Sequence, residues 1–131
     1  MRVVILGAGR LGIRVSLQLS EKGYRVILVD ANEGKFKNVP AKSLIERRSG
    51  DIFHEEILRE IFREVPDVFV AVTGKDNINL MIAQIVKMRY KVPRIIARVF
   101  DPKLAEVYRK FGLEIICPTN FALAEIVRTI G

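Results

Sequence analysis

The sequence predicts an α/β fold, with a doubly wound parallel sheet of six strands and helices on both faces. Two observations lead to this prediction. Short apolar segments alternate with segments of helical periodicity along the 131 residues, which is the pattern of a parallel sheet covered by helices. The first apolar segment also ends in three glycines, Gly7, Gly9 and Gly12, where a strand turns into a helix.

The first unit combines a buried strand at 3–6 with a helix on which Leu11, Val15 and Leu19 recur every four residues. A continuous apolar run is typical of a strand that is buried on both faces. The helical spacing then begins inside the glycine segment, so these glycines connect strand to helix.

Each of the three glycines has a separate role in such a turn. Gly7 permits the tight turn, Gly9 lets the backbone approach a pyrophosphate, and Gly12 lets helix and strand pack closely. The helix N-terminus offers free N–H groups and a partial positive charge to a phosphate. The spacing therefore predicts a nucleotide site, and the alternative is a turn-and-packing motif with no ligand.

A second strand at 25–29 follows Gly23, which is placed to end the helix, and this strand ends in Asp30. An acidic residue about 20 residues after the glycines binds the ribose of a nucleotide. Asp30 would accept both ribose hydroxyls and repel a 2′-phosphate, which argues against NADP. Lys35 and Lys37 would weaken that repulsion.

The middle of the chain continues the alternation. Residues 31–40 leave room for a turn or two of helix, and the short charged segment 43–48 is expected to be a strand at the sheet edge. Asp51 is a candidate N-cap for the next helix, which carries Phe53, Ile57, Leu58, Ile61 and Phe62 and ends before Pro66.

The second half contains three more strand–helix units. The apolar segment 67–73 predicts a central strand, and Asp76 is a candidate cap for a helix with Met81, Ile82, Ile85 and Met88. Strands at 94–99 and 114–117 follow. Between them, Asp101-Pro102 begins a helix whose inner face is expected to be Leu104, Val107, Tyr108 and Phe111, ending at Gly112. A last helix begins at Thr119 or Asn120 and carries an apolar stripe of Leu123, Ile126, Val127 and Ile130.

This succession matches the Rossmann topology, with strand order 3-2-1-4-5-6. That order places a crevice outside the carboxyl ends of the strands, between the first and fourth strands. The loops at 7–12, 30–31, 50–52 and 73–76 are expected to open on this crevice.

Composition favours one cytosolic domain spanning 1–131. The longest apolar runs are far below the roughly 18 residues of a membrane span, so no direct membrane insertion is expected. A strand begins almost at once, and no secretory signal is visible. Cys117 is the only cysteine, which excludes an internal disulfide and a thiolate metal cluster.

The net charge of +7 does not by itself indicate nucleic-acid binding. Many cations fall near the expected helix C-termini, where they complement the helix dipole. No basic run is interleaved with aromatic residues, as a nucleic-acid platform requires. We therefore expect no nucleic acid, and an anionic ligand or an acidic face on a partner accounts for the charge equally well.

At residue 73 the sequence departs from a generic dehydrogenase half and resembles a particular nucleotide-binding family, with matching segments that span nearly the whole chain. The chain is similar to TrkA-N domains, also called RCK or KTN domains, which regulate potassium channels and transporters. The resemblance is carried by residues 4–12, Asp30, Gly50-Asp51, Ala71-Val72-Thr73 with Asp76 and Asn79-Leu80, Ile96-Ala97-Arg98-Val99 with Asp101-Pro102, Phe111-Gly112 and Pro118. Ile52-Phe53 departs from the Ala-Thr or Ala-Ser usual in the family, and the helix after Asp30 is shorter than usual.

The resemblance implies a regulatory subunit of a potassium uptake transporter or channel. It implies binding of NAD(H) or of an adenine nucleotide, ATP, ADP or AMP, and a location at the inner face of the membrane through a membrane transporter subunit. No C-terminal ligand-binding subdomain follows Gly131, so we expect a stand-alone ring component or one that acts beside a separate subunit. In this family the last helix crosses to a neighbouring subunit, which implies a homodimer or a ring of dimers.

We expect the nucleotide to contact residues from six segments of the chain. Arg10 meets a phosphate according to the resemblance, or is a solvated arginine of the first helical turn. Asp51 contacts adenine or ribose, or caps a helix. Asn79 belongs to the site or only to a helix first turn, and Arg98 belongs to the site or to a surface salt bridge. The full set of expected binding residues is Gly7, Ala8, Gly9, Arg10, Leu11, Gly12, Asp30, Ala31, Gly50, Asp51, Ile52, Thr73, Gly74, Asn79 and Arg98.

The sequence predicts no catalytic site. It contains no paired carboxylates, Ser-His-Asp set or metal-ligand spacing. His54, the sole histidine, is expected three residues into a helix in a solvated position, and Cys117 is expected to be a small buried hydrophobe. The alternative function is an NAD-dependent oxidoreductase domain that lacks its substrate domain.

Overall fold

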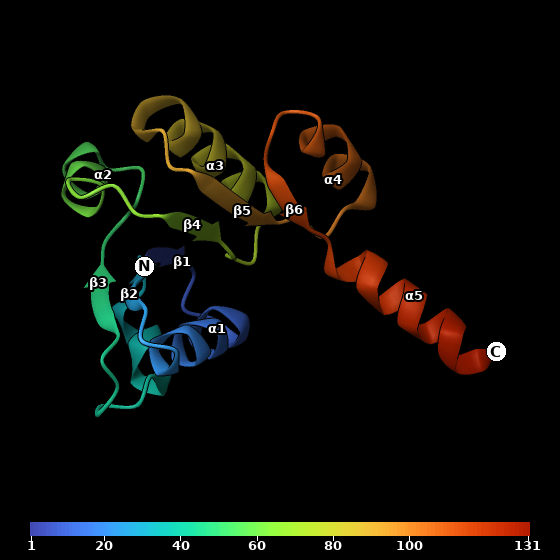
Figure 1. Cartoon of the computed structure of the whole chain (residues 1–131), viewed down its shortest axis with the longest axis horizontal. Helices are drawn as coiled ribbons and strands as arrows, with labels where there is room; N and C mark the ends of the chain where they lie inside the picture. The colour runs from blue at the N-terminus through green and yellow to red at the C-terminus, as the bar shows by residue number, and fades with distance from the viewer.

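The structure is a computed structural model of residues 1–131 and contains one six-stranded sheet of order β3-β2-β1-β4-β5-β6 (Figure 1). All five strand pairs are parallel. This confirms the predicted Rossmann-like fold class and strand order. The elements are β1 Arg2–Leu6, α1 Arg10–Glu21, β2 Arg25–Asp30, the 3-10 helix η1 Glu33–Asn38, β3 Glu46–Ser49, α2 Glu55–Ile61, β4 Val68–Ala71, α3 Asp76–Tyr90, β5 Arg94–Arg98, α4 Pro102–Arg109, β6 Glu114–Ile116 and α5 Pro118–Ile130.

Two hydrophobic cores lie on the two faces of the sheet. Alternate residues of a strand point to opposite faces, so Val4 and Phe69 contribute to one core and Ile5 and Val70 to the other. The larger core is covered by α2, α3 and α4, and the smaller one by α1 and η1. The apolar strands predicted from the sequence are therefore buried on both faces, as expected for a parallel sheet.

The glycines of the first turn allow α1 to pack directly against the sheet. A Cβ atom on Gly12 would lie 1.7 Å from the carbonyl oxygen of Gly7, and one on Gly7 would lie 2.7 Å from the carbonyl oxygen of Val72. Gly7 also has a φ of +116°, which side-chain-bearing residues rarely adopt. These contacts confirm the expected roles of Gly7 in the turn and Gly12 in helix–strand packing.

Several predicted element boundaries and faces are wrong. β3 begins at Glu46, because residues 40–45 form a turn and an irregular segment. The inner face of α4 is formed by Ala105, which is fully buried, and by Tyr108, which packs against the larger core as expected, whereas Leu104, Val107 and Phe111 are exposed. A small residue lets the short helix approach the sheet closely, so the large apolar residues lie at its sides. Last, α5 begins at Pro118, one or two residues before the expected start at Thr119 or Asn120.

Two expected helix caps have other roles. Asp76 is the first residue of α3, and its carboxylate accepts hydrogen bonds from the backbone N–H groups of Phe100 and Asp101. Asp51 accepts from the N–H of Phe53 in a turn that precedes α2. The N-cap of α2 is His54, so this histidine lies before the helix rather than inside it.

The last helix, α5, projects away from the sheet (Figure 1) and has no buried residue. Its apolar stripe, Leu123, Ile126, Val127 and Ile130, is between 58% and 83% exposed. On the body of the protein, α1 and strands β4 to β6 border an uncovered apolar groove of about 430 Å³ on the side of the smaller core. The chain therefore presents an uncovered helix and an uncovered sheet surface. None of its helices has the length and apolar character that crossing a membrane requires.

Candidate functional site

The predicted site lies at the carboxyl ends of β1, β2 and β4, where the loops that follow these strands surround a hollow of about 570 Å³. Parallel strands bring their carboxyl ends to one edge of the sheet, and the switch in strand order between β1 and β4 opens a crevice there. Seven of the expected residues line this one hollow: Asp30, Ala31, Gly50, Asp51, Ile52, Thr73 and Gly74.

Asp30 connects the crevice to the phosphate loop. Its Oδ2 atom accepts a hydrogen bond of 2.9 Å from the N–H of Ala8, and its Oδ1 atom accepts one of 2.8 Å from the N–H of Asn32. Lys35 places its ammonium group 3.7 Å from Oδ2. An ionised carboxylate offers about four acceptor sites. The two N–H groups use two of them, and Lys35 at 3.7 Å forms an ion pair without a hydrogen bond, so about two sites remain for ribose hydroxyls.

The phosphate loop presents open backbone at Gly9. A Cβ atom on Gly9 would meet no atom within 4 Å, so the space over this residue is free for a ligand. Arg10 is the first residue of α1 and is exposed, and the first turn of this helix contains no acidic side chain. The free N–H groups and partial positive charge at this helix end favour an anion. Ala8, Gly9 and Arg10 border a second hollow beside the crevice.

Asn79 is expected from the sequence as a binding residue, but the structure places it in the interior with no exposed surface. Its Oδ1 atom accepts from the N–H and the hydroxyl of Thr73, and its Nδ2 atom donates to the carbonyl oxygens of Thr73 and Arg98. These four bonds satisfy the amide and tie the turn after β4 to the end of β5. The contribution of Asn79 is therefore to position Thr73.

The side chains of Arg98 and Leu11 also lie outside the crevice. Both line the uncovered groove between α1 and the sheet. The Arg98 guanidinium donates to the carbonyl oxygens of Val72 and Thr73 and lies 4.8 Å from the centre of the Phe100 ring. Burial lowers the pKa of Arg98, and nearby Asp76 opposes this shift. Arg98 makes none of the salt bridges that the alternative interpretation required.

Asp51 lines the crevice and uses its carboxylate to hold the turn at Phe53. Beside it, the buried side chain of Ile52 offers an apolar surface. The helix-cap interpretation of Asp51 is wrong, because α2 begins only at Glu55. Cys117 is buried in the larger core, as expected.

Sequence reasoning missed some residues around the site. Phe53, Lys75 and Ile78 line the crevice, and Arg14 and Asn38 line the adjoining hollow. Their neighbours in the loops at 50–52 and 73–76 could have indicated the first three. Arg14 follows Arg10 by one helical turn, and this spacing could have indicated that the two side chains share a face.

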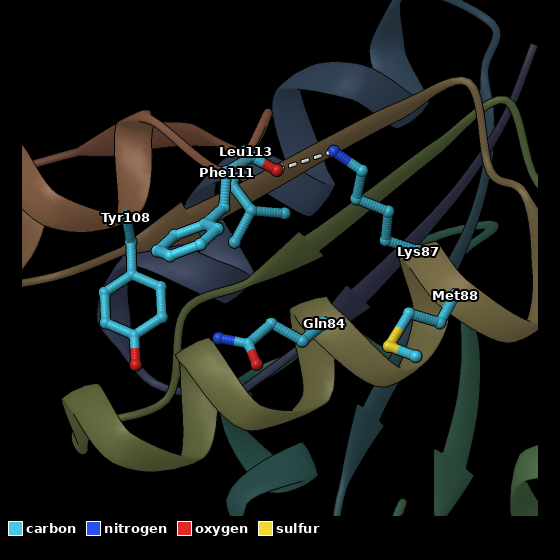
Figure 2. Close-up of a pocket in the computed structure, with 6 residues that line it drawn as sticks. All are labelled: Gln84, Lys87, Met88, Tyr108, Phe111 and Leu113. Carbon is cyan, nitrogen blue, oxygen red and sulfur yellow. Dashed lines mark hydrogen bonds between the residues drawn. The ribbon is translucent and has the colours of Figure 1, made fainter.

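A further apolar hollow lies between α3 and α4, at the other end of the sheet (Figure 2). It has a volume of about 500 Å³ and is lined by Gln84, Lys87, Met88, Tyr108, Phe111 and Leu113. These residues precede β5 and β6, whereas ligands of doubly wound sheets bind beyond the carboxyl ends of the strands. The Lys87 ammonium group donates to the carbonyl oxygen of Phe111 (Figure 2), which joins α3 to the turn after α4. This hollow is separate from the predicted crevice.

Comparison with known structures supports the same architecture. The TrkA-N domain of the inner membrane protein ybaL from Escherichia coli aligns over 99% of this chain and 96% of its own, with a TM-score of 0.81 and 12% identity. A structure described as "Shewanella denitrificans Kef CTD in AMP bound form" aligns over 100% of this chain and 82% of its own, with a TM-score of 0.77 and 22% identity. At these identities the likeness establishes the fold alone.

Comparison with curated sequences gives the family. The Trk system potassium uptake protein TrkA of Mycobacterium tuberculosis is 32% identical over 100% of this chain and 61% of its own length. The protein of the same name from Streptomyces coelicolor is 28% identical over 99% of this chain and 58% of its own. The chain thus spans about 60% of these relatives. The TrkA-N domain family matches residues 3–118, and the chain belongs to this family.

Proposed function

We propose that this chain is a nucleotide-sensing regulatory domain of a potassium uptake system, and that NAD(H) or an adenine nucleotide binds in the crevice between β1 and β4. The observation that carries the proposal is the hydrogen bond from Ala8 to Asp30. It places a candidate phosphate loop directly beside a candidate ribose-binding carboxylate. Family membership then directs this binding site toward potassium transport.

The proposed binding mode divides the nucleotide among three groups of residues. Asp30 accepts the ribose hydroxyls, and the loop from Gly7 to Gly12 holds the phosphates at the N-terminus of α1. Ala31, Ile52, Thr73 and Gly74 surround the base. Because Asp30 reads the ribose shared by NAD(H), ATP, ADP and AMP, this arrangement supports all four ligands.

Regulation requires that the nucleotide bind one assembly state better than another, because a ligand shifts an equilibrium only by its differential affinity. We propose that the domain acts on the cytoplasmic side of a membrane potassium transporter subunit. In this proposal it forms a homodimer or a ring of dimers.

The uncovered surfaces suggest how such an assembly forms. The apolar stripe of α5 and the groove between α1 and β4–β6 are both exposed in one chain. If α5 of each copy lies in the groove of the other, both surfaces are covered in an isologous dimer. Helix exchange of this kind is the assembly that we propose.

Isothermal titration with NAD, NADH, ATP, ADP and AMP tests the nucleotide site, and mass spectrometry of ligand co-purified with the protein identifies the bound species. An assay for hydride transfer with NADH then tests the enzymatic alternative. Saturable binding without turnover supports a sensor. Absence of binding by all five nucleotides would contradict the proposal, and turnover would favour an oxidoreductase.

A further inference from the structure

The hollow beside the phosphate loop is lined by three cations and no acid. It has a volume of about 690 Å³, and its charged lining residues are Arg10, Arg14 and Lys35. Arg10 and Arg14 come from the first half of α1, and Lys35 comes from η1. The remaining lining residues are Ala8, Gly9, Ile13, Leu17 and Asn38, so the hollow begins at the backbone of the phosphate loop.

The placement of these cations is electrostatically unfavourable in the free protein. Arg10 and Arg14 are four residues apart on one helix, where like charges face each other and repel. Both also lie in the half of α1 where the helix dipole is positive, and the dipole disfavours a cation in the first turn. Neither side chain makes a hydrogen bond or an ion pair, whereas seven arginines elsewhere in the chain pair with glutamates.

Lys35 connects this hollow to the crevice. It lines both, and its ammonium group lies 3.7 Å from the Asp30 carboxylate. The charge of Asp30 is thus shared with Lys35 and with two backbone N–H groups. Because Lys35 lines both the hollow and the crevice, a dianion that binds Arg10 and Arg14 would contact the Lys35 ammonium group before it reached the Asp30 carboxylate.

We propose that Arg10, Arg14 and Lys35 form a second phosphate site, next to the 5′-phosphate position, that takes a phosphate monoester dianion. This proposal rests on the proposed function for the location of the nucleotide. The dianion comes either from a phosphate on one ribose hydroxyl of the bound nucleotide or from a separate phosphate. In the first case that hydroxyl gives up its bond to Asp30, and the Lys35 ammonium group beside the carboxylate offsets the added negative charge. In both cases the dianion relieves the repulsion between the arginines, so nucleotide binding responds to a second phosphate.

Arg14 is the residue to change, because it lines only this hollow. Titration calorimetry compares AMP, adenosine 2′,5′-bisphosphate, adenosine 3′,5′-bisphosphate and inorganic phosphate, the last with and without saturating AMP. The proteins are the full chain, Arg14→Gln, and the control Arg63→Gln, which removes an exposed arginine that has no ion pair and lies outside every hollow described. Thermal melts verify that all three are folded.

A ribose-borne phosphate predicts that one of the bisphosphates binds the unmodified chain about tenfold tighter than AMP, the effect expected of a charge-assisted contact. A separate phosphate predicts that inorganic phosphate binds when AMP is saturating and that the bisphosphates gain nothing. In either case Arg14→Gln removes most of the gain, while Arg63→Gln changes it by less than about twofold.

The second site is overturned if neither bisphosphates nor inorganic phosphate show such a gain, or if Arg14→Gln and Arg63→Gln behave alike. Failure of AMP itself to bind is a different result and contradicts the proposed function. In that event the titration with inorganic phosphate alone decides the second site, through its dependence on Arg14.

Discussion

At the scale of single residues, Asp30 has a structural role beside its proposed binding role, and the sequence could not separate the two. Its position at the end of β2 indicated a ribose ligand, and the structure adds that the same carboxylate accepts the N–H groups of Ala8 and Asn32. The geometry of the phosphate loop therefore depends on the residue that is proposed to read the ribose.

Replacing Asp30 should consequently affect both binding and stability. We predict that Asp30→Ala weakens binding of any adenosine nucleotide at least tenfold, since a charged acceptor contributes about 1.5–3 kcal/mol. It should also lower the free energy of unfolding by about 1–3 kcal/mol, because two N–H groups lose their acceptor. Calorimetric titration and urea unfolding measure the two effects. Asp30→Asn, which keeps the shape, is the control, and unchanged affinity in folded Asp30→Ala would refute the assignment.

Arg10 is the second residue whose role a substitution can define. If its guanidinium meets a terminal phosphate, Arg10→Ala should weaken ATP about tenfold or more, and AMP much less. Titration with both nucleotides measures this difference. Equal losses would identify a contact to the 5′-phosphate, and no loss for either nucleotide would leave Arg10 as a solvated arginine.

At the scale of elements, the strands and their order were predictable, and the packing of polar side chains was not. Apolar runs bounded by glycine, aspartate and proline predicted β1, β4 and the crevice, because burial on both faces leaves a plain pattern in the sequence. Asn79 and Arg98 occur in family motifs, but Asn79 bonds to Thr73 and to the distant backbone of Arg98, and Arg98 bonds to the distant backbone of Val72 and Thr73. A motif does not distinguish a polar residue that contacts a ligand from one that positions a loop.

The same limit explains the error at α4. Its apolar residues suggested a broad inner face, but Ala105 makes the close contact and Phe111 is 61% exposed. Which apolar residues of a short helix face the sheet depends on how closely the helix approaches, and this depends on tertiary packing.

The structural role of Asn79 leads to a prediction about the loop between β4 and α3. Asn79→Ala should lower the free energy of unfolding by about 3 kcal/mol, because it leaves buried partners of the amide without hydrogen bonds. Asn120→Ala, at an exposed position on α5, should change it by less than about 0.5 kcal/mol. Chemical denaturation of both variants measures the difference, and equal stabilities would mean that the network around Thr73 does not hold the turn.

At the scale of the whole molecule, the exposed helix α5 is the main feature that one chain does not explain. Its apolar stripe was visible in the sequence. The surface that would cover this stripe belongs to other elements, so the sequence of the helix does not reveal it. The structure adds a candidate, the groove between α1 and β4–β6. Two uncovered surfaces, as well as the family resemblance, therefore favour the proposed assembly.

We predict that the chain is a dimer or a larger ring at micromolar concentration and that changing both Leu123 and Ile126 to glutamate makes it monomeric. Two buried apolar side chains lost from each interface, about 1.5–3 kcal/mol apiece, are sufficient for this effect. Light scattering measures the mass. A control with Ala124→Glu and Arg128→Gln changes the net charge equally outside the stripe and should stay assembled.

Two results of the light-scattering experiment would contradict the proposed assembly. A monomeric unmodified chain would refute the prediction, and an unchanged oligomer of the folded Leu123 and Ile126 variant would place the interface elsewhere. Ile116→Glu tests the groove from the other side, because Ile116 lines it and is 41% exposed. Helix exchange requires that this variant also dissociate.

In the proposed binding mode a nucleotide phosphate lies over the open backbone of Gly9, and a substitution at this residue tests the claim. Calorimetric titration with AMP and NADH compares the unmodified chain with Gly9→Val. A side chain at Gly9 meets no protein atom within 4 Å, so the variant should fold, but the side chain occupies the space of the phosphate. We predict saturable binding by the unmodified chain and none by folded Gly9→Val. Equal affinity of the two proteins for either ligand would contradict the claim.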